Sequence, residues 1–183
     1  MSEEQLIKEI KNNPVLFEKI YNQHYTTIFN YCYRRTGDFD ASKDITSETF
    51  LKAYLNIHKF IWKGIPIISW LYRITTNEIN LYYRSKKYKP ELLNEIYSES
   101  FISTNIEKLE EEKSNAELEM EKHEQFMKVQ GALRKIPFKY QEVIILKYYE
   151  RLKIKEISSI LNKKEGTVKS LLSRGISMLR EKI

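Results

Sequence analysis

The chain has 183 residues, of which 42% are hydrophobic, so it can form one or two small domains and is too apolar for a disordered protein. Its 5 glycines and 4 prolines disfavour a turn-rich all-β fold, and its single cysteine, Cys32, excludes an internal disulfide and a zinc site built from cysteine pairs. The net charge is +6, no apolar run approaches roughly 18 residues, and the acidic start MSEEQLIKEI is unlike a secretion signal. We therefore expect a cytoplasmic protein without membrane insertion, and the three scattered histidines suggest neither a metal site nor a cofactor.

The positive charge lies in two blocks that flank an acidic segment. Residues 1–90 carry 14 Lys/Arg and 9 Asp/Glu, residues 91–125 carry 3 and 11, and residues 126–183 carry 14 and 5. Basic blocks favour binding to a polyanion such as nucleic acid, although ordinary solvated lysine-rich faces would give the same counts.

Helical periodicity accounts for most of the chain. Apolar residues at helical spacing predict helices over residues 14–37, 41–58, 66–87, 106–136, 139–150, 153–161 and 165–182. Residues 91–105 show no clear period and are rich in Ser, Glu and Asn, which indicates a linker. We predict an all-α fold with two small helical domains, residues 1–90 and 126–183, joined by an acidic linker over residues 91–125.

The helix predicted over residues 41–58 has two apolar stripes. One stripe, sufficient to bury the helix on its own domain, consists of Phe50, Ala53, Tyr54 and Ile57. The opposite side combines apolar and charged residues: Leu51, Leu55, Asp44, Glu48 and, at the edge, Lys52. Such a helix either lies inside a bundle or faces a partner, and the residues alone leave both interpretations open.

The helix predicted over residues 66–87 carries a row of groups suited to nucleic acid. The row consists of Trp70, Arg73, Asn77, Asn80 and Arg84. Aromatic, amide and guanidinium groups can stack on an unstacked base and bond to its edge. For Trp70 and Tyr72, which lie next to Leu71 and Ile74, the sequence favours a place in the core over contact with nucleic acid.

The last two predicted helices form a helix-turn-helix. Asn162 lies between them, where a left-handed turn residue is needed. One arc of the final helix is apolar, and the opposite arc holds Thr167, Lys169, Ser170, Ser173, Arg174, Ser177 and Arg180. This second arc is small, hydroxyl-rich and cationic, with no acid, which is typical of a helix that reads the major groove of DNA. The alternative is a plain helical hairpin.

Three stretches resemble the extracytoplasmic-function (ECF) group of bacterial sigma factors. ALRKIPFKYQEVIILKYYERLKIKEISSILNKKEGTVKSLLSRGISMLR (132–180) is similar to their C-terminal promoter-reading domain. ASKDITSETFLKAYLNIHKF (41–60) resembles their polymerase-binding helix, and SWLYRITTNEINLYYRSKK (69–87) their promoter-melting helix. The sequence departs from the family pattern at Ala41, Lys43 and Ser47, at Lys164 in the cap position of the last helix, and at Leu171 after GTVKS.

The resemblance implies three sets of contact residues. In the family, the helix over 41–58 docks on the clamp helices of the largest subunit of RNA polymerase, which assigns polymerase binding to Asp44, Ser47, Glu48, Leu51, Lys52 and Leu55. The family captures a flipped base during melting, which assigns binding of the downstream element to Phe60, Trp62, Lys63, Trp70, Arg73, Asn77, Asn80, Arg84, Lys86 and Lys87. The resemblance assigns binding of the upstream element to the last helix and its cap, namely Lys164, Thr167, Lys169, Ser170, Ser173, Arg174 and Ser177.

Between the two tryptophans of the melting region, the sequence favours Trp62 for DNA contact. Trp62 and Lys63 lie in a loop with Gly64, whereas Trp70 lies within the apolar middle of a helix. Trp62→Ala is therefore expected to impair promoter opening with little loss of stability, and Trp70→Ala to do the reverse.

The resemblance implies a sigma factor that binds core RNA polymerase, recognises the −35 and −10 promoter elements and initiates transcription. Its partners would be core polymerase, double-stranded and melted promoter DNA, and an anti-sigma factor. An enzyme is not expected, because no paired-carboxylate, Cys/His or phosphate-loop arrangement is visible. The alternative is a stand-alone helix-turn-helix transcriptional regulator that acts without polymerase.

Overall fold

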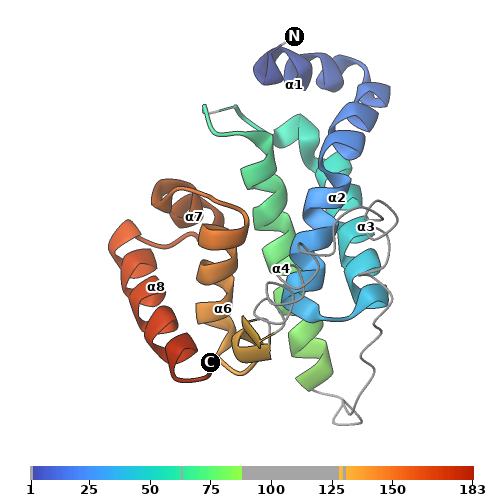
Figure 1. Ribbon diagram of the computed structural model, residues 1–183. Helices are drawn as coiled ribbons and strands as arrows, with labels where there is room; N and C mark the ends of the chain where they lie inside the picture. The colour runs from blue at the N-terminus through green and yellow to red at the C-terminus, as the bar shows by residue number, and fades with distance from the viewer. Residues whose placement is uncertain (1, 63, 88–127, 130) are drawn as a thin grey trace, which may run out of the picture.

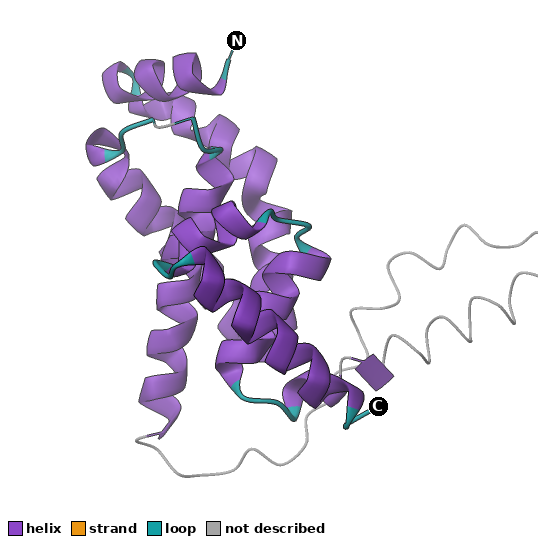
Figure 2. Cartoon of the chain, turned by 90° about the vertical axis from the view of Figure 1, so that its left-hand side faces the viewer, coloured by secondary structure: helices purple, strands orange, loops and turns teal. Residues whose placement is uncertain are grey.

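The protein is described by a computed structural model that covers residues 2–62, 64–87, 128–129 and 131–183. All regular structure within these ranges is helical, as predicted, and Figure 2 shows helices joined by short loops. The predicted acidic linker and most of the helix predicted over residues 106–136 lie outside the described residues.

Within residues 2–62 and 64–87, four α-helices form the N-terminal unit, which Figure 1 draws in blue to green. They are α1 (Glu3–Asn12), α2 (Phe17–Thr36), α3 (Phe39–Asn56) and α4 (Ile67–Lys87). Two short 3₁₀ turns, Pro14–Leu16 and Ile57–Lys59, precede α2 and follow α3. The helices α2, α3 and α4 were predicted within a few residues, whereas α1 was not predicted as an element.

Local signals in the sequence explain where these helices begin and end. Ser2 and Gln5 form a capping box at the start of α1, and Asp38 caps α3 by accepting a hydrogen bond from the backbone N–H of Ala41 at 2.9 Å. Gly37 ends α2 with φ of 67°, a left-handed conformation that favours glycine.

Among the described residues, the C-terminal unit consists of a helical segment over residues 131–134 and three further helices. They are α6 (Phe138–Ile144), which continues into a π-helical turn over Ile145–Tyr149, α7 (Ile154–Leu161) and α8 (Glu165–Arg180). Asn162 adopts φ of 51° between α7 and α8, which confirms the predicted left-handed turn. The core of the C-terminal unit contains Val143, Leu146, Ile157 and Val168, all at most 1% exposed.

The two units pack directly on each other through α4 and the C-terminal helices (Figures 1 and 2). Arg34 Nη1 of α2 lies 2.8 Å from Glu150 Oε1, and the Tyr72 hydroxyl of α4 donates to the other oxygen of the same carboxylate. Arg35 Nη1 lies 3.5 Å from Glu142 Oε1 of α6. The contact is therefore partly ionic, with charged groups from both units removed from water.

Gly175 allows α8 to approach α6 closely. A Cβ atom at this position would lie 3.0 Å from Ile144 Cδ1 and 3.1 Å from Tyr140 Cβ. Overpacking costs about 1–3 kcal/mol and the higher helix propensity of Ala returns about 1 kcal/mol, so Gly175→Ala should lower the free energy of unfolding by up to about 2 kcal/mol, measured by urea denaturation. Gly166→Ala, in the same helix, is the control: its Cβ would meet nothing within 4 Å, so it should gain up to about 1 kcal/mol. Equal stability of the two variants would refute this description of the α6–α8 contact.

Candidate polymerase and nucleic-acid interfaces

The outer face of α3 exposes two leucines side by side. The inner face buries Ile45, Phe50 and Ala53, whereas Leu51 and Leu55 on the outer face are 52% and 57% exposed. Exposed leucines one helical turn apart are typical of a surface that a partner covers. The sequence left open whether this helix lies inside a bundle or faces a partner. Within the described chain, its outer face is not inside a bundle.

Carboxylates accompany these leucines. Asp44 and Ser47 are exposed and Glu48 is half-buried. Lys52 Nζ lies 3.2 Å from Glu48 Oε1 and 2.7 Å from Glu78 Oε2 of α4, and the hydrogen bond with Glu78 raises the pKa of Lys52. All six residues predicted to bind polymerase thus lie on one helix, but Lys52 is already paired across to α4.

Tyr54 corrects one detail of the sequence prediction. It was assigned to the buried stripe of α3, but it is 44% exposed, and its ring packs edge-on against Phe17 with centroids 5.4 Å apart. Tyr54 therefore lies at the margin of the core, where its ring packs on the buried Phe17.

A groove with acidic walls runs between α3 and α4, adjacent to this face. It has a volume of about 490 Å³ and is lined by Asp44, Ile45, Glu48, Glu78, Leu81, Tyr82 and Ser85. The lining combines three carboxylates with the apolar side chains of Ile45 and Leu81, and two of these carboxylates, Glu48 and Glu78, are already paired with Lys52.

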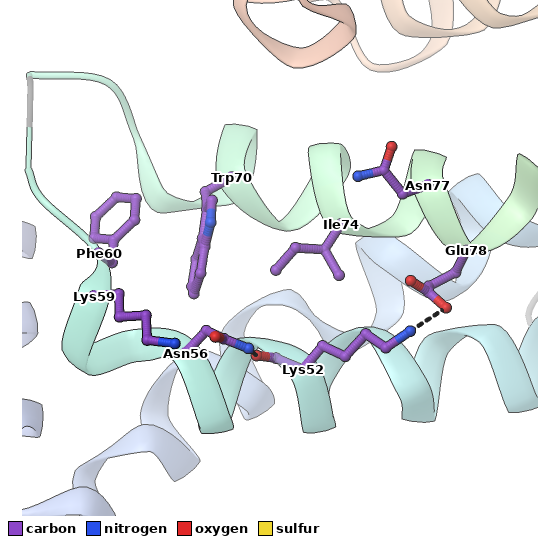
Figure 3. A pocket seen from close by; sticks show the side chains of 8 residues that line it. All are labelled: Lys52, Asn56, Lys59, Phe60, Trp70, Ile74, Asn77 and Glu78. Carbon is purple, nitrogen blue, oxygen red and sulfur yellow. Dashed lines mark hydrogen bonds and ion pairs between the residues drawn. The ribbon is translucent and has the colours of Figure 1, made fainter.

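A pocket of about 360 Å³ lies between α4 and the end of α3 (Figure 3). It is lined by Lys52, Asn56, Lys59, Phe60, Trp70, Ile74, Asn77 and Glu78. The rings of Phe60 and Trp70 contact each other at a centroid distance of 4.8 Å and an angle of 42°. Figure 3 shows Trp70, Ile74 and Glu78 pointing from α4 toward α3, whereas the Asn77 side chain does not point toward α3. The pocket therefore combines an aromatic wall with amide, ammonium and carboxylate groups.

The pocket unites three residues of the predicted melting set, namely Phe60, Trp70 and Asn77. Asn56, Lys59, Ile74 and Glu78 were not predicted to belong to it. A signal for the latter two was available, because Trp70, Ile74, Asn77 and Glu78 recur at the spacing of one helical face. Asn56 also has a structural role, since its amide nitrogen donates to the Lys52 carbonyl at 2.9 Å.

Other members of the melting set lie outside this pocket. Arg73 and Arg84 are exposed on α4 and Asn80 is half-buried. Trp62 is half-buried, packs against the core and does not line the pocket. Lys86 and Lys87 end α4, but their side chains, like Lys63 as a whole, lie outside the described residues.

The outer face of α8 presents the predicted polar arc to solvent. Thr167, Lys169, Ser170, Ser173, Arg174 and Ser177 are all exposed, while Val168, Leu172 and Gly175 are buried on the opposite side. Ser170 Oγ donates to the Thr167 carbonyl at 2.9 Å and Ser177 Oγ to that of Ser173 at 3.2 Å. Because these two hydroxyl protons are used, the oxygens face outward as acceptors. Lys164 is exposed at the N-cap of α8, where its side chain makes no capping bond within the described chain.

The described residues contain neither a membrane-spanning helix nor a metal-binding cluster. None of their helices is long and apolar enough to cross a membrane. They also contain no group of three or more His, Cys, Asp or Glu side chains that could hold a metal ion.

Comparisons with known proteins match both units. Residues 20–88 match the family model of sigma-70 region 2, and residues 126–179 match that of sigma-70 region 4. The chain is 32% identical over 182 residues to the ECF RNA polymerase sigma factor SigW of Bacillus subtilis (strain 168), covering 97% of this chain and 94% of SigW.

Solved structures share the fold. CnrH, solved in complex with the cytosolic domain of CnrY, aligns with a TM-score of 0.65 at 19% identity over 96% of this chain and 93% of that one. The sigma factor RpoE from Bartonella quintana, solved with the anti-sigma factor NepR, aligns with a TM-score of 0.66 at 19% identity over 90% of this chain and 94% of that one. Given the SigW relationship and the two sigma-70 regions, the chain belongs to the ECF sigma factors, which direct RNA polymerase to promoters.

Proposed function

We propose that this sigma factor docks on core RNA polymerase through the outer face of α3 and captures an unstacked promoter base in the pocket between α3 and α4. The observation that carries the proposal is the pocket itself, where the Phe60 and Trp70 rings lie beside amide and ammonium groups. Upstream DNA is read by the exposed cationic arc of α8.

The chemistry of the pocket fits a nucleobase. Extruding a base from a duplex costs a few kcal/mol, and stacking on an aromatic side chain returns about 1–3 kcal/mol per base. The Trp70 ring supplies stacking, and Asn77, an exposed residue that also lines the pocket, can bond to a base edge. Lys59 provides positive charge for the adjacent phosphate.

The face of α3 and the pocket share a residue. Lys52 bonds to Glu48, beside the polymerase face, and to Glu78, in the wall of the pocket. Docking of polymerase on α3 therefore takes place directly beside the site of base capture. In this proposal, polymerase docking and base capture use adjacent sides of the helix pair α3 and α4.

The upstream and downstream surfaces must separate for both promoter elements to be bound together. Elements centred at −35 and −10 are about 25 base pairs apart, roughly 85 Å of B-DNA at 3.4 Å per base pair. A compact chain of this length is only about 40 Å across. We therefore include in the proposal that the two units, packed together here, undock when the sigma factor engages polymerase and DNA.

An anti-sigma factor remains a proposed partner. RpoE from Bartonella quintana was solved with NepR, and CnrH with the cytosolic domain of CnrY. The exposed leucines of α3 are a surface that such a protein could cover in competition with polymerase. The stand-alone regulator considered from the sequence is not favoured, because the chain carries both sigma-70 regions.

The pocket reverses the expectation for the two tryptophans. Trp70→Ala should weaken binding of a single-stranded non-template oligonucleotide about tenfold or more, because the stacking wall is lost. Binding is measured by fluorescence anisotropy with the polymerase holoenzyme, on a promoter that the wild-type protein transcribes. Asn77→Ala, which changes an exposed residue of the pocket lining, should weaken binding without loss of stability.

Trp62→Ala is the matched control, since Trp62 packs against the core and does not line the pocket. If Trp62→Ala weakens oligonucleotide binding while Trp70→Ala and Asn77→Ala leave it unchanged, base capture takes place elsewhere.

A further inference from the structure

The N-terminal helix α1 contacts both ends of the segment that leads from the pocket into α4. Lys11 Nζ donates to the Phe60 carbonyl oxygen at 2.7 Å. The Glu3 carboxylate Oε1 accepts a hydrogen bond from the Ile67 backbone N–H at 2.9 Å. These contacts span 49 and 64 residues of sequence, and α1 lies outside both ranges matched by the sigma-70 family models.

Both hydrogen bonds are made to backbone atoms of residues next to the pocket, the carbonyl of Phe60 and the N–H of Ile67. Phe60 forms one wall of the pocket, and Ile67 begins the helix that carries Trp70 one turn later. The distance between Phe60 and Trp70, and hence the width of the aromatic wall, depends on where the segment from Phe60 to Ile67 begins and ends.

Glu3 accepts a hydrogen bond from the Ile67 N–H, which has no partner within its own helix. The first N–H groups of a helix have no partner within the helix, and the N-terminus carries a partial positive charge. A carboxylate that accepts from Ile67 N therefore makes a charge-assisted bond and fixes the first turn of α4. Lys11 makes the corresponding charge-assisted bond at the other end, to a carbonyl that follows the turn over Ile57–Lys59.

The segment between these two contacts is only partly anchored among its described residues. Trp62 packs against the core, whereas Ile61 is 70% exposed and Gly64 is exposed with φ of 69°. On either side, Ile7 and Ile10 of α1 are 2% and 0% exposed, and Ile67 of α4 is 1% exposed. The two hydrogen bonds therefore tie the buried helix α1 to the backbone at Phe60 and to the buried start of α4.

We infer that α1 is a brace for base capture, in which Glu3 and Lys11 are positioning residues that hold Ile67 and Phe60 at the spacing the pocket requires. This inference rests on the proposed function of the pocket. The residues do not touch DNA in this role; they act through the backbone of the segment.

The test compares matched pairs on one helix. Lys11→Ala and Glu3→Ala should each weaken binding of the single-stranded non-template oligonucleotide to the holoenzyme by about 3–10-fold. Lys8→Ala and Glu4→Ala are the controls, because Lys8 and Glu4 pair with each other at 2.8 Å with side chains 72% and 47% exposed. The controls should leave oligonucleotide binding unchanged, and all four variants should bind core polymerase as the wild-type protein does.

Two further readouts separate positioning from general stabilisation. Lys11→Arg and Glu3→Gln keep a donor and an acceptor, so they should recover most of the lost affinity. Hydrogen exchange of the Ile67 amide should accelerate in Glu3→Ala and not in Glu4→Ala.

The brace is refuted if Lys11→Ala and Glu3→Ala bind the oligonucleotide as tightly as their controls while Trp70→Ala binds it weakly. If Trp70→Ala and Asn77→Ala also bind normally, the pocket itself is not the capture site, and the proposed function fails at that point instead.

Discussion

Leu51→Arg should lower the affinity for core RNA polymerase by about 30-fold or more without unfolding the protein. Leu51 is 52% exposed, so its replacement leaves the core intact, and Arg is a good helix former. The change removes an apolar anchor and places a charge where the partner must exclude water. Central apolar anchors of interfaces typically contribute about 2 kcal/mol or more, and 1.4 kcal/mol corresponds to tenfold in affinity.

The matched control is Val15→Arg. Val15 is 74% exposed in the turn before α2 and is not part of α3, so the same substitution there should leave polymerase binding unchanged. Affinity is measured by titrating core polymerase with labelled protein. If Leu51→Arg and Val15→Arg bind equally well, the outer face of α3 is not the docking surface.

Arg35→Met should loosen the packing between the two units, at a cost of about 3 kcal/mol to the docked arrangement. The side chains of Arg35 and Glu142 are 1% and 10% exposed, and removing one partner of a buried pair leaves a buried charge uncompensated. Burial raises the pKa of Glu142 even with Arg35 beside it, so desolvation already outweighs the attraction. Because Glu142 can take up a proton once Arg35 is gone, the cost falls at the lower end of the usual 3–5 kcal/mol.

The measurement is small-angle scattering. If the two units separate, Arg35→Met should have a larger radius of gyration than the wild-type protein. The double variant Arg35→Met, Glu142→Leu removes both charges and should return to the compact value, since apolar side chains can replace a buried pair. Arg73→Met, which changes an exposed arginine of α4, is the control and should scatter like the wild type. An unchanged radius for Arg35→Met would show that this pair does not hold the units together.

The periodic parts of the fold were predictable from the sequence. Long helices with one apolar face, such as α2 and α8, follow from spacing alone, and Asn162 marks the turn between α7 and α8. The exposed arc of α8 was predictable for the same reason, because an amphipathic helix has only one way to bury its apolar side.

The missed helix α1 carried a weaker signal. It is only ten residues long, yet the spacing of Ser2 and Gln5 is the sequence signature of the capping box that begins it. Its contacts with Phe60 and Ile67 were not predictable, since hydrogen bonds to a distant backbone leave no pattern in the side chains.

The pocket and the contact between units depend on which helix faces meet. Glu78 joins Lys52 across α3 and α4, and Arg35 meets Glu142 from more than a hundred residues away. In a chain with 31 basic and 25 acidic residues, many such pairs are possible, and only the packing of the helices selects among them. The position of Trp70 in the pocket was not predictable for a related reason, because Trp70 is half-buried, packs against the core and also lines the pocket.

Run-off transcription with purified core polymerase shows whether this chain directs promoter-specific initiation. Genomic fragments are transcribed with core polymerase alone, with the wild-type protein added, and with Leu51→Arg added. We expect discrete promoter-dependent transcripts only with the wild-type protein, and their loss with Leu51→Arg. Transcripts that do not depend on the added protein, or binding of promoter fragments without any polymerase-dependent initiation, would contradict this expectation.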